Sequence, residues 1–189
     1  MRAYYRDLSA TDLTLPHDTG RTVLEERFRV LKLKFWTVKG TDVECEKQFR
    51  AIGEDLGFVD GTRKEVVSDF AKLDPKSAEE QAKFFAQDVL VLNDVISFIK
   101  EGKCYYDFKD PETNDYIRIL MRPGRACFAP EGTIVQRYPY AETKDRLCIY
   151  DVYKTAEPLV GQASLVPSHG QDLRSDPVRV TYLKDIGVA

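Results

Sequence analysis

The sequence predicts a mainly β protein with helices in its N-terminal half, whose strands form a small antiparallel barrel or sandwich. From residue 88 onward, stretches of alternating apolar and polar residues recur about every 8–12 residues, with turn residues between them. Before residue 88, apolar residues recur mostly at helical spacing. A chain of 189 residues is long enough to enclose a core without disulfides. We therefore expect one domain.

The N-terminal half contains the predicted helices. Thr22 and Ser77 are each followed three residues later by a glutamate, Glu25 and Glu80, which is the pattern of a capping box. Gly57 suits the left-handed residue that ends many helices. The expected elements are a strand at 2–6, a loop at 9–20, a helix at 23–31, a strand at 33–38, and helices at 42–57, around 66–73 and at 77–85.

The C-terminal half contains the predicted sheet. Its strands are expected at 89–92, 95–100, 104–108, 116–121, 125–128, 134–140 and 146–153. Residues 158–177 are polar and irregular, and residues 178–183 have the alternation of a last strand at the sheet edge. The single domain is thus expected to have its core at about 88–153, a helical insertion at about 42–86 and a polar C-terminal extension at 158–189.

Composition and charge argue against several classes of partner and location. The net charge is −3 and basic residues are scattered among acidic ones, so we expect no nucleic-acid partner. No apolar run approaches the ~20 residues that cross a bilayer, and the first residues carry no apolar signal segment. The four cysteines lie far apart. We expect an intracellular protein, cytoplasmic or nuclear, with no membrane partner; organelle or cytoskeletal association is the alternative.

The order of elements and several motifs resemble the cupin-fold acireductone dioxygenases of methionine salvage, over roughly residues 2–160. Arg-Ala-Tyr-Tyr-Arg-Asp at 2–7 is similar to the opening strand of that family. Gly-Lys-Cys-Tyr-Tyr-Asp-Phe-Lys-Asp at 102–110 and Tyr-Ile-Arg-Ile-Leu-Met at 116–121 follow its central pattern. Pro-Glu-Gly at 130–132 with Gln-Arg-Tyr at 136–138 resembles the end of its site. The resemblance implies a cupin-type antiparallel β-barrel, or jelly roll, with N-terminal helices.

The resemblance also implies a metal site whose ligands this chain lacks. Active family members hold the metal on His-x-His-x(3)-Glu and a later His, which correspond here to Val89, Val91, Val95 and Gln136. The substrate-orienting arginine of the family corresponds to Ser97. A valine has no lone pair, and an amide is a poor ligand for Fe²⁺ or Ni²⁺ beside imidazole and carboxylate. We therefore expect no cofactor, with valines turning a metal cavity into apolar core.

Other residues do not supply a replacement set. The chain has only two histidines, His17 and His169, both outside the predicted barrel strands, whereas the family site needs three. By alternation Asp88 faces away from Val89, and Asp94 lies in a turn.

The leading interpretation is a catalytically inactive family member, a pseudoenzyme rather than an enzyme. It would serve as a structural or protein-interaction subunit of a larger assembly, with other proteins as its partners. Tyr138 and Tyr140, an aromatic pair at a strand end, are the candidates for its interface.

Two alternatives stay open. The first is a metal-independent cupin that binds a small molecule in a residual cavity. That cavity would be lined by Val89, Val91, Val95, Phe98 and Gln136. The second is a divergent acireductone dioxygenase whose metal ligands are altered, for example to Asp88 or Asp94.

Overall fold

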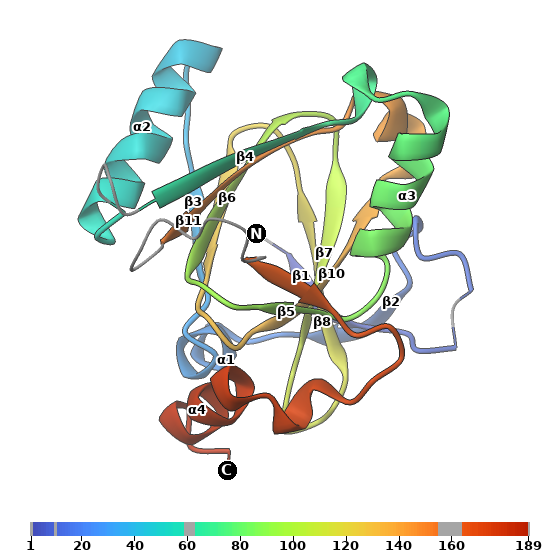
Figure 1. Ribbon diagram of the computed structural model, residues 1–189, viewed down its shortest axis with the longest axis vertical. Coiled ribbons are helices and arrows are strands. Elements are labelled where there is room, and N and C mark those ends of the chain that lie inside the picture. Colours follow the sequence, from blue (N-terminus) through green and yellow to red (C-terminus); the bar gives the residue numbers. More distant parts are fainter. Residues whose placement is uncertain (1, 10, 59–62, 155–163, 189) are drawn as a thin grey trace.

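Two antiparallel sheets enclose an apolar interior in the computed structural model, which describes residues 2–9, 11–58, 63–154 and 164–188 (Figure 1). The larger sheet has seven strands in the order β12-β5-β10-β7-β8-β1-β2, and the smaller has five in the order β3-β9-β6-β11-β4. The strands are β1 Ala3–Arg6, β2 Asp18–Thr22, β3 Lys34–Thr37, β4 Arg63–Asp69, β5 Val89–Val91, β6 Val95–Glu101, β7 Cys104–Lys109, β8 Tyr116–Met121, β9 Arg125–Ala129, β10 Ile134–Pro139, β11 Cys148–Lys154 and β12 Leu165–Pro167. The mainly β jelly-roll class expected from the sequence is confirmed.

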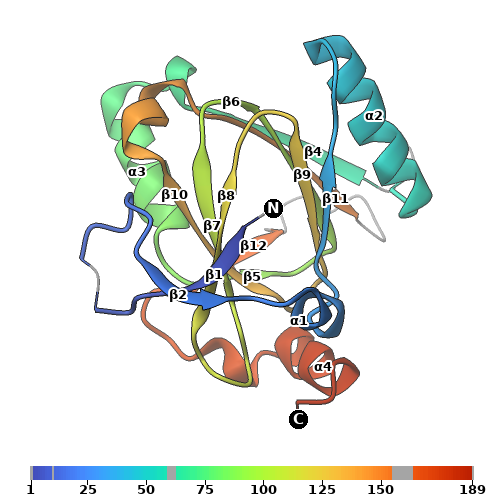
Figure 2. The ribbon, with the colours of Figure 1, turned by 180° about the vertical axis from the view of Figure 1, so that it is seen from behind.

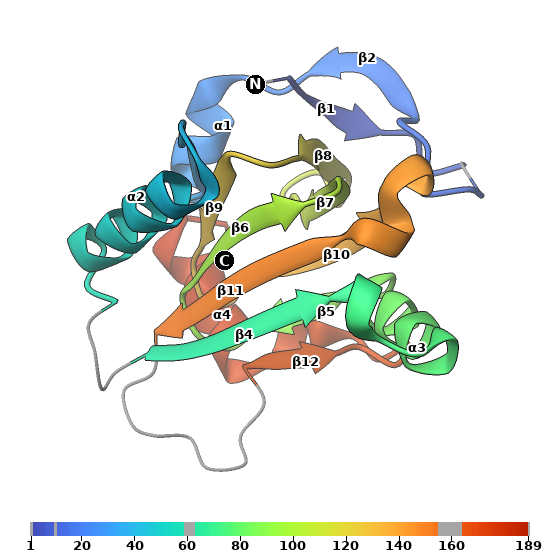
Figure 3. The same cartoon turned by 90° about the horizontal axis from the view of Figure 1, so that it is seen from above.

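The helices lie outside the barrel (Figures 1 and 3). They are α1 Glu25–Val30, α2 Asp42–Asp55, α3 Pro75–Phe85 and α4 Pro177–Asp185, with the short 3₁₀-helices η1 Phe70–Lys72, η2 Ala141–Arg146 and η3 Leu173–Ser175. α4 lies beside α1 at one end of the barrel (Figure 2), where the Tyr182 hydroxyl donates to the carbonyl of Leu31. No helix in the described residues combines the length and apolarity needed to span a membrane.

Alternation along the strands separates two apolar clusters. On β6, Val95 and Ile99 belong to the main core between the sheets, whereas Ile96 and Phe98 belong to a second cluster under α2. Phe49 of α2 is fully buried against this outer face, with its ring stacked on Phe98 at 5.4 Å between centroids. The barrel interior is therefore defined by every second residue of each strand.

Three predicted elements have another form in the structure. The helix expected around 66–73 is wrong: this segment is β4 followed by η1, because β4 pairs with β11 from Arg63 to Asp69. The strand expected at 178–183 is also wrong, since Pro177 begins α4 with Asp176 as its N-cap. Part of the loop expected at 9–20 is β2, and β12 was not expected.

Helix starts were also misplaced. Thr22 ends β2, and α1 begins after Leu24 without a side-chain cap. α3 begins at Pro75 behind the Asp74 cap, so Ser77 is already inside the helix. By contrast, α2 matches the expected 42–57 helix closely, with Gly57 at φ +82° just beyond it.

Candidate functional site in the barrel interior

The three valines at the ligand positions implied by the resemblance lie inside the barrel. Val89, Val91 and Val95 are 1%, 0% and 2% exposed. Val91 and Val95 belong to the main core, and Val89 lies on the same side of β5 as Val91. Their side chains offer only methyl groups to the interior, so they can supply packing but not coordination.

Gln136 lies on the other side of its strand. Its neighbour Val135 belongs to the core, and Gln136 points away from it into a polar network on the outer face of the seven-stranded sheet. There its Oε1 accepts hydrogen bonds from Arg6 Nη1 at 3.1 Å and from the Tyr138 hydroxyl at 2.8 Å, and its Nε2 donates to Asp88 Oδ1 at 2.9 Å. The position that the resemblance gives for a fourth ligand therefore does not face the valines.

The interior nevertheless contains a polar cluster that the sequence reasoning missed. Arg137 on β10 reaches across the barrel, and its Nη1 lies 2.7 Å from Asp151 Oδ2 on β11. Its Nη2 donates to the hydroxyl of Ser97 on β6 at 3.2 Å, and that hydroxyl donates to Asp151. The three residues are 1–2% exposed. We refer to Ser97, Arg137 and Asp151 as the interior cluster.

Aromatic and thiol side chains surround the interior cluster. The Arg137 guanidinium carbon lies 4.6 Å from the centroid of the Tyr106 ring and 5.2 Å from that of Phe85. Burial raises the pKa of Tyr106 and raises that of Cys127 to about 12, so both stay protonated. Burial opposes the charge on Arg137, but the Asp151 carboxylate outweighs it and the pKa of Arg137 is raised. The cluster is a fixed ion pair with neutral neighbours.

Two buried atoms beside the ion pair, the Tyr106 hydroxyl and Arg137 Nε, have no hydrogen-bond partner within the described part of the chain. The guanidinium of the interior cluster comes from Arg137 on β10, although the resemblance places a guanidinium at Ser97 on β6. An alternation argument could have found Arg137 and Asp151, because each lies two positions after an apolar residue of the core, Val135 and Ile149 respectively.

The side chains present do not fit the metal of the family. Among the described residues, no group of three or more His, Cys, Asp or Glu side chains is placed to hold a metal ion. Asp88 accepts from the Tyr116 hydroxyl at 2.6 Å and pairs with Lys109 at 3.0 Å, while Asp94 accepts from the backbone N–H of Glu131 at 3.0 Å. Both carboxylates thus have partners outside the interior. His17 and His169 lie in the segments before β2 and after β12.

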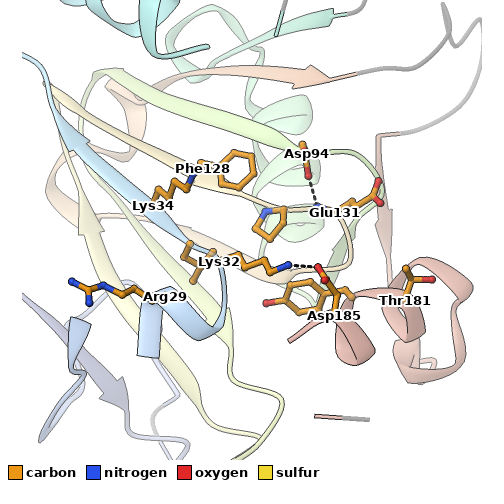
Figure 4. A pocket seen from close by; sticks show the side chains of 11 residues that line it. Arg29, Lys32, Lys34, Asp94, Phe128, Glu131, Thr181 and Asp185 are labelled. Carbon is orange, nitrogen blue, oxygen red and sulfur yellow. Dashed lines mark hydrogen bonds and ion pairs between the residues drawn. The ribbon is translucent and has the colours of Figure 1, made fainter. Parts of the chain in front are cut away.

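The cavity expected between the valines and their neighbours is not formed by the residues proposed. Phe98 faces α2 and Gln136 faces the outer network, so neither can line one space with Val95. A cavity of about 600 Å³ lies instead at the end of the barrel, between the α1–β3 turn and α4 (Figure 4). Its lining carries three cations and three carboxylates, with Lys32 paired to Asp185. This cavity does not reach the valines.

The two tyrosines proposed as an interface differ in exposure. Tyr138 is 6% exposed, and its hydroxyl oxygen lies 2.8 Å from both the carbonyl oxygen of Ala86 and Gln136 Oε1, so its one proton is shared between the two acceptors. Tyr140 is half-buried, with its ring 5.7 Å from that of Tyr105 and 5.0 Å from Lys103 Nζ. Only Tyr140 offers surface to a partner, and its role there stays a prediction.

Comparisons with known proteins agree with this architecture. The model of the ARD/ARD' family matches residues 2–152. "Acireductone dioxygenase 1" of Coprinopsis cinerea is 27% identical over 193 aligned residues, covering 100% of this chain and 99% of that protein. "Acireductone dioxygenase" of Homo sapiens is 28% identical over 134 residues, covering 70% and 72%. Acireductone dioxygenase from Bacillus anthracis, solved with a cadmium ion in its active center, superimposes with a TM-score of 0.57 at 10% identity, over 82% of this chain and 94% of that one.

These comparisons correct one expectation. The inference from the sequence that this chain is not an enzyme is overturned, because relatives that match most or all of its length are named as enzymes. The physical reason is that the expectation depended on four positions assigned by resemblance alone, whereas the interior contains a buried ion pair and two polar atoms without a partner among the described residues. Loss of activity does not follow from those four positions.

Proposed function

This chain belongs to the ARD/ARD' family, and from that premise we propose that it is a member without the metal-ligand set of the family and acts as a protein-interaction subunit of a larger assembly. The interaction role depends on the outer surface of the protein, so a catalytic activity in the barrel interior does not conflict with it. A cytoplasmic or nuclear location stays part of the proposal.

One surface feature carries the proposal, an apolar groove of about 580 Å³ between η1, α3 and the end of β10. It is lined by Thr14, Phe70, Ala71, Leu73, Pro75, Ala78, Glu79, Ala82 and Pro139. Leu15, next to Thr14, leaves 45% of its surface exposed, and Tyr140 follows Pro139. Exposed apolar surface rimmed by polar residues is typical of protein-binding sites. The groove suits an apolar segment of another protein.

The test is capture with a matched pair of variants. Ala71 lines the groove and is exposed, so Ala71→Glu places a charge there with little cost to folding. Ala51→Glu makes the same change at an exposed position on the outer face of α2. A partner retained by the wild type and by Ala51→Glu, but lost by Ala71→Glu, supports the proposal. Equal retention by all three proteins, or no stoichiometric partner at all, would contradict it.

A second candidate function is acireductone dioxygenase activity in a divergent form. The alignment over all of this chain and nearly all of the Coprinopsis cinerea protein favours it. The test is turnover of an acireductone by the purified chain, alone and with added Fe²⁺ or Ni²⁺. Turnover above the uncatalysed rate would support the candidate. Turnover no faster than the uncatalysed rate under all three conditions would remove it.

A further inference from the structure

A second cavity, of about 500 Å³, lies where the C-terminal segment crosses the outer face of the seven-stranded sheet. Its walls come from the β7–β8 connection, β10, η3 and α4. It is lined by Asp88, Lys109, Pro111, Asn114, Ile134, Gln171, Asp172, Leu173, Arg174, Arg179, Leu183 and Val188. We refer to it as the C-terminal pocket. This size is in the range of small-molecule sites.

The charges that line the C-terminal pocket do not balance. Lys109 pairs with Asp88 at 3.0 Å, and Arg174 pairs with Asp172 at 3.0 Å. Arg179 has no carboxylate partner among the described residues, although it is only 2% exposed. The pocket therefore contains one buried positive charge in excess.

The contacts of Arg179 leave part of its guanidinium free. Nη1 donates to the carbonyl of Gly132 at 2.7 Å, and the buried Nε has no hydrogen-bond partner among the residues that the structure describes. Burial lowers the pKa of Arg179, although Tyr182 and the Asp88 carboxylate, which forms no ion pair with it, act in the opposite direction. A buried guanidinium with an unused donor is costly unless an anion or water satisfies it.

The uncharged part of the lining is mainly apolar, with Asn114 and Gln171 as its two polar residues. Leu183, Ile134 and Val188 line it together with Pro111 and Leu173. A ligand that matches both parts of the lining has an anionic head for the guanidinium and a short hydrocarbon tail. A carboxylate fits the fork of an arginine through two parallel hydrogen bonds. We propose that this pocket binds a small monocarboxylate with a short apolar chain, held by Arg179. The inference does not depend on the proposed interaction role or on catalysis.

The experiment is calorimetric titration of the full chain with butyrate, butylammonium and inorganic phosphate. Butyrate should bind, butylammonium should not because its head is positive, and phosphate should bind more weakly because it lacks the tail. Equal binding of butyrate and butylammonium, tighter binding of phosphate, or no binding of butyrate would each overturn the proposal.

A variant pair tests the location. Leu183 is one helical turn after Arg179 on α4, so Leu183→Glu places a carboxylate beside the guanidinium and should weaken butyrate binding by about tenfold or more. Leu24→Glu, at the 69% exposed N-cap position of α1, makes the same change elsewhere and should bind as the wild type does. If Leu183→Glu fails to fold, Leu173→Glu tests the η3 wall in the same way. Unchanged binding in a folded pocket variant would refute the assignment.

Discussion

At the scale of single residues, one buried ion pair gives the mainly apolar interior of this barrel its charged groups. Arg137 and Asp151 are buried on opposite sheets, and Ser97 contacts both. Moving two charged groups out of water costs free energy. Removing one partner of a buried pair is strongly destabilising, because the other charge then stays buried without a counterion. Val91 and Val95 of the same interior contribute apolar packing and no polar atom that could bind either charge.

Removing one partner of that pair should be strongly destabilising. Asp151→Asn leaves the Arg137 charge buried without its counterion, and we expect the free energy of unfolding to fall by about 3–5 kcal/mol, measured by urea titration. Asp115→Asn breaks an exposed pair with Arg21 and should cost at most about 1 kcal/mol. A loss in Asp151→Asn no larger than this control would show that the pair is not buried as described.

Asp110 should govern part of the stability at low pH. Its side chain is fully buried, and although burial alone would raise its pKa, hydrogen bonds from Arg27 and the Glu112 N–H lower it. Because the folded pKa lies below the unfolded value of about 3.9, the stabilisation is complete above that pH and is lost as pH falls through the folded pKa. Asp110→Asn should therefore lower stability at neutral pH and flatten the acid limb in urea titrations. Parallel pH profiles would contradict this.

At the scale of elements, α4 is held by a close approach to the β9–β10 turn. Gly132 has φ +82°, and a Cβ there would lie 2.3 Å from Tyr182 Cβ and 2.9 Å from the carbonyl oxygen of Val178. Arg179 donates to the carbonyl of the same glycine. The same helix supplies Arg179 and Leu183 to the lining of the C-terminal pocket.

Gly132→Ala should loosen α4. The left-handed backbone alone costs about 1–2 kcal/mol for alanine, and the contact with Tyr182 adds to it. Gly170→Ala is the matched control, since Gly170 also has φ +82° but no atom lies within 4 Å of the place that an alanine Cβ would take. Gly132→Ala should lower the free energy of unfolding by clearly more than Gly170→Ala and speed hydrogen exchange in α4. Equal effects would mean that only the backbone conformation matters.

At the scale of the whole molecule, the two faces of the seven-stranded sheet differ, one being mainly apolar and the other mainly polar. The inner face of the seven-stranded sheet contributes to the main core, and its outer face holds the network of Arg6, Asp107, Arg118 and Gln136. A substitution one position along β10 therefore moves a side chain from one environment to the other. This alternation decides which of the ligand positions implied by the resemblance face the interior.

Restoring a metal site tests which face each position occupies. Val89→His, Val91→His and Val95→Glu together should destabilise the chain in the presence of a chelator, by about 1–3 kcal/mol for each unpaired buried group. Adding Val135→His should increase the rise in melting temperature that Ni²⁺ causes in the triple variant, because position 135 faces inward. Adding Gln136→His instead should give no increase beyond that of the triple variant. An equal Ni²⁺ effect in both quadruple variants would show that β10 has a different register.

The sequence by itself determined the strands between residues 88 and 154, the helix α2, and the presence of valine at three positions that the resemblance gives as metal ligands. Those features depend on local alternation, helical spacing and residue chemistry, which need no tertiary information. Only the tertiary structure decided that β4 is a strand, because pairing with β11 outweighs a local helical pattern. It also showed that residues 177–185 form a helix, which packs closely against Gly132. It also decided that Gln136 faces outward and that Arg137, from β10, reaches Asp151 on β11, since residues on different sheets meet only when the barrel closes.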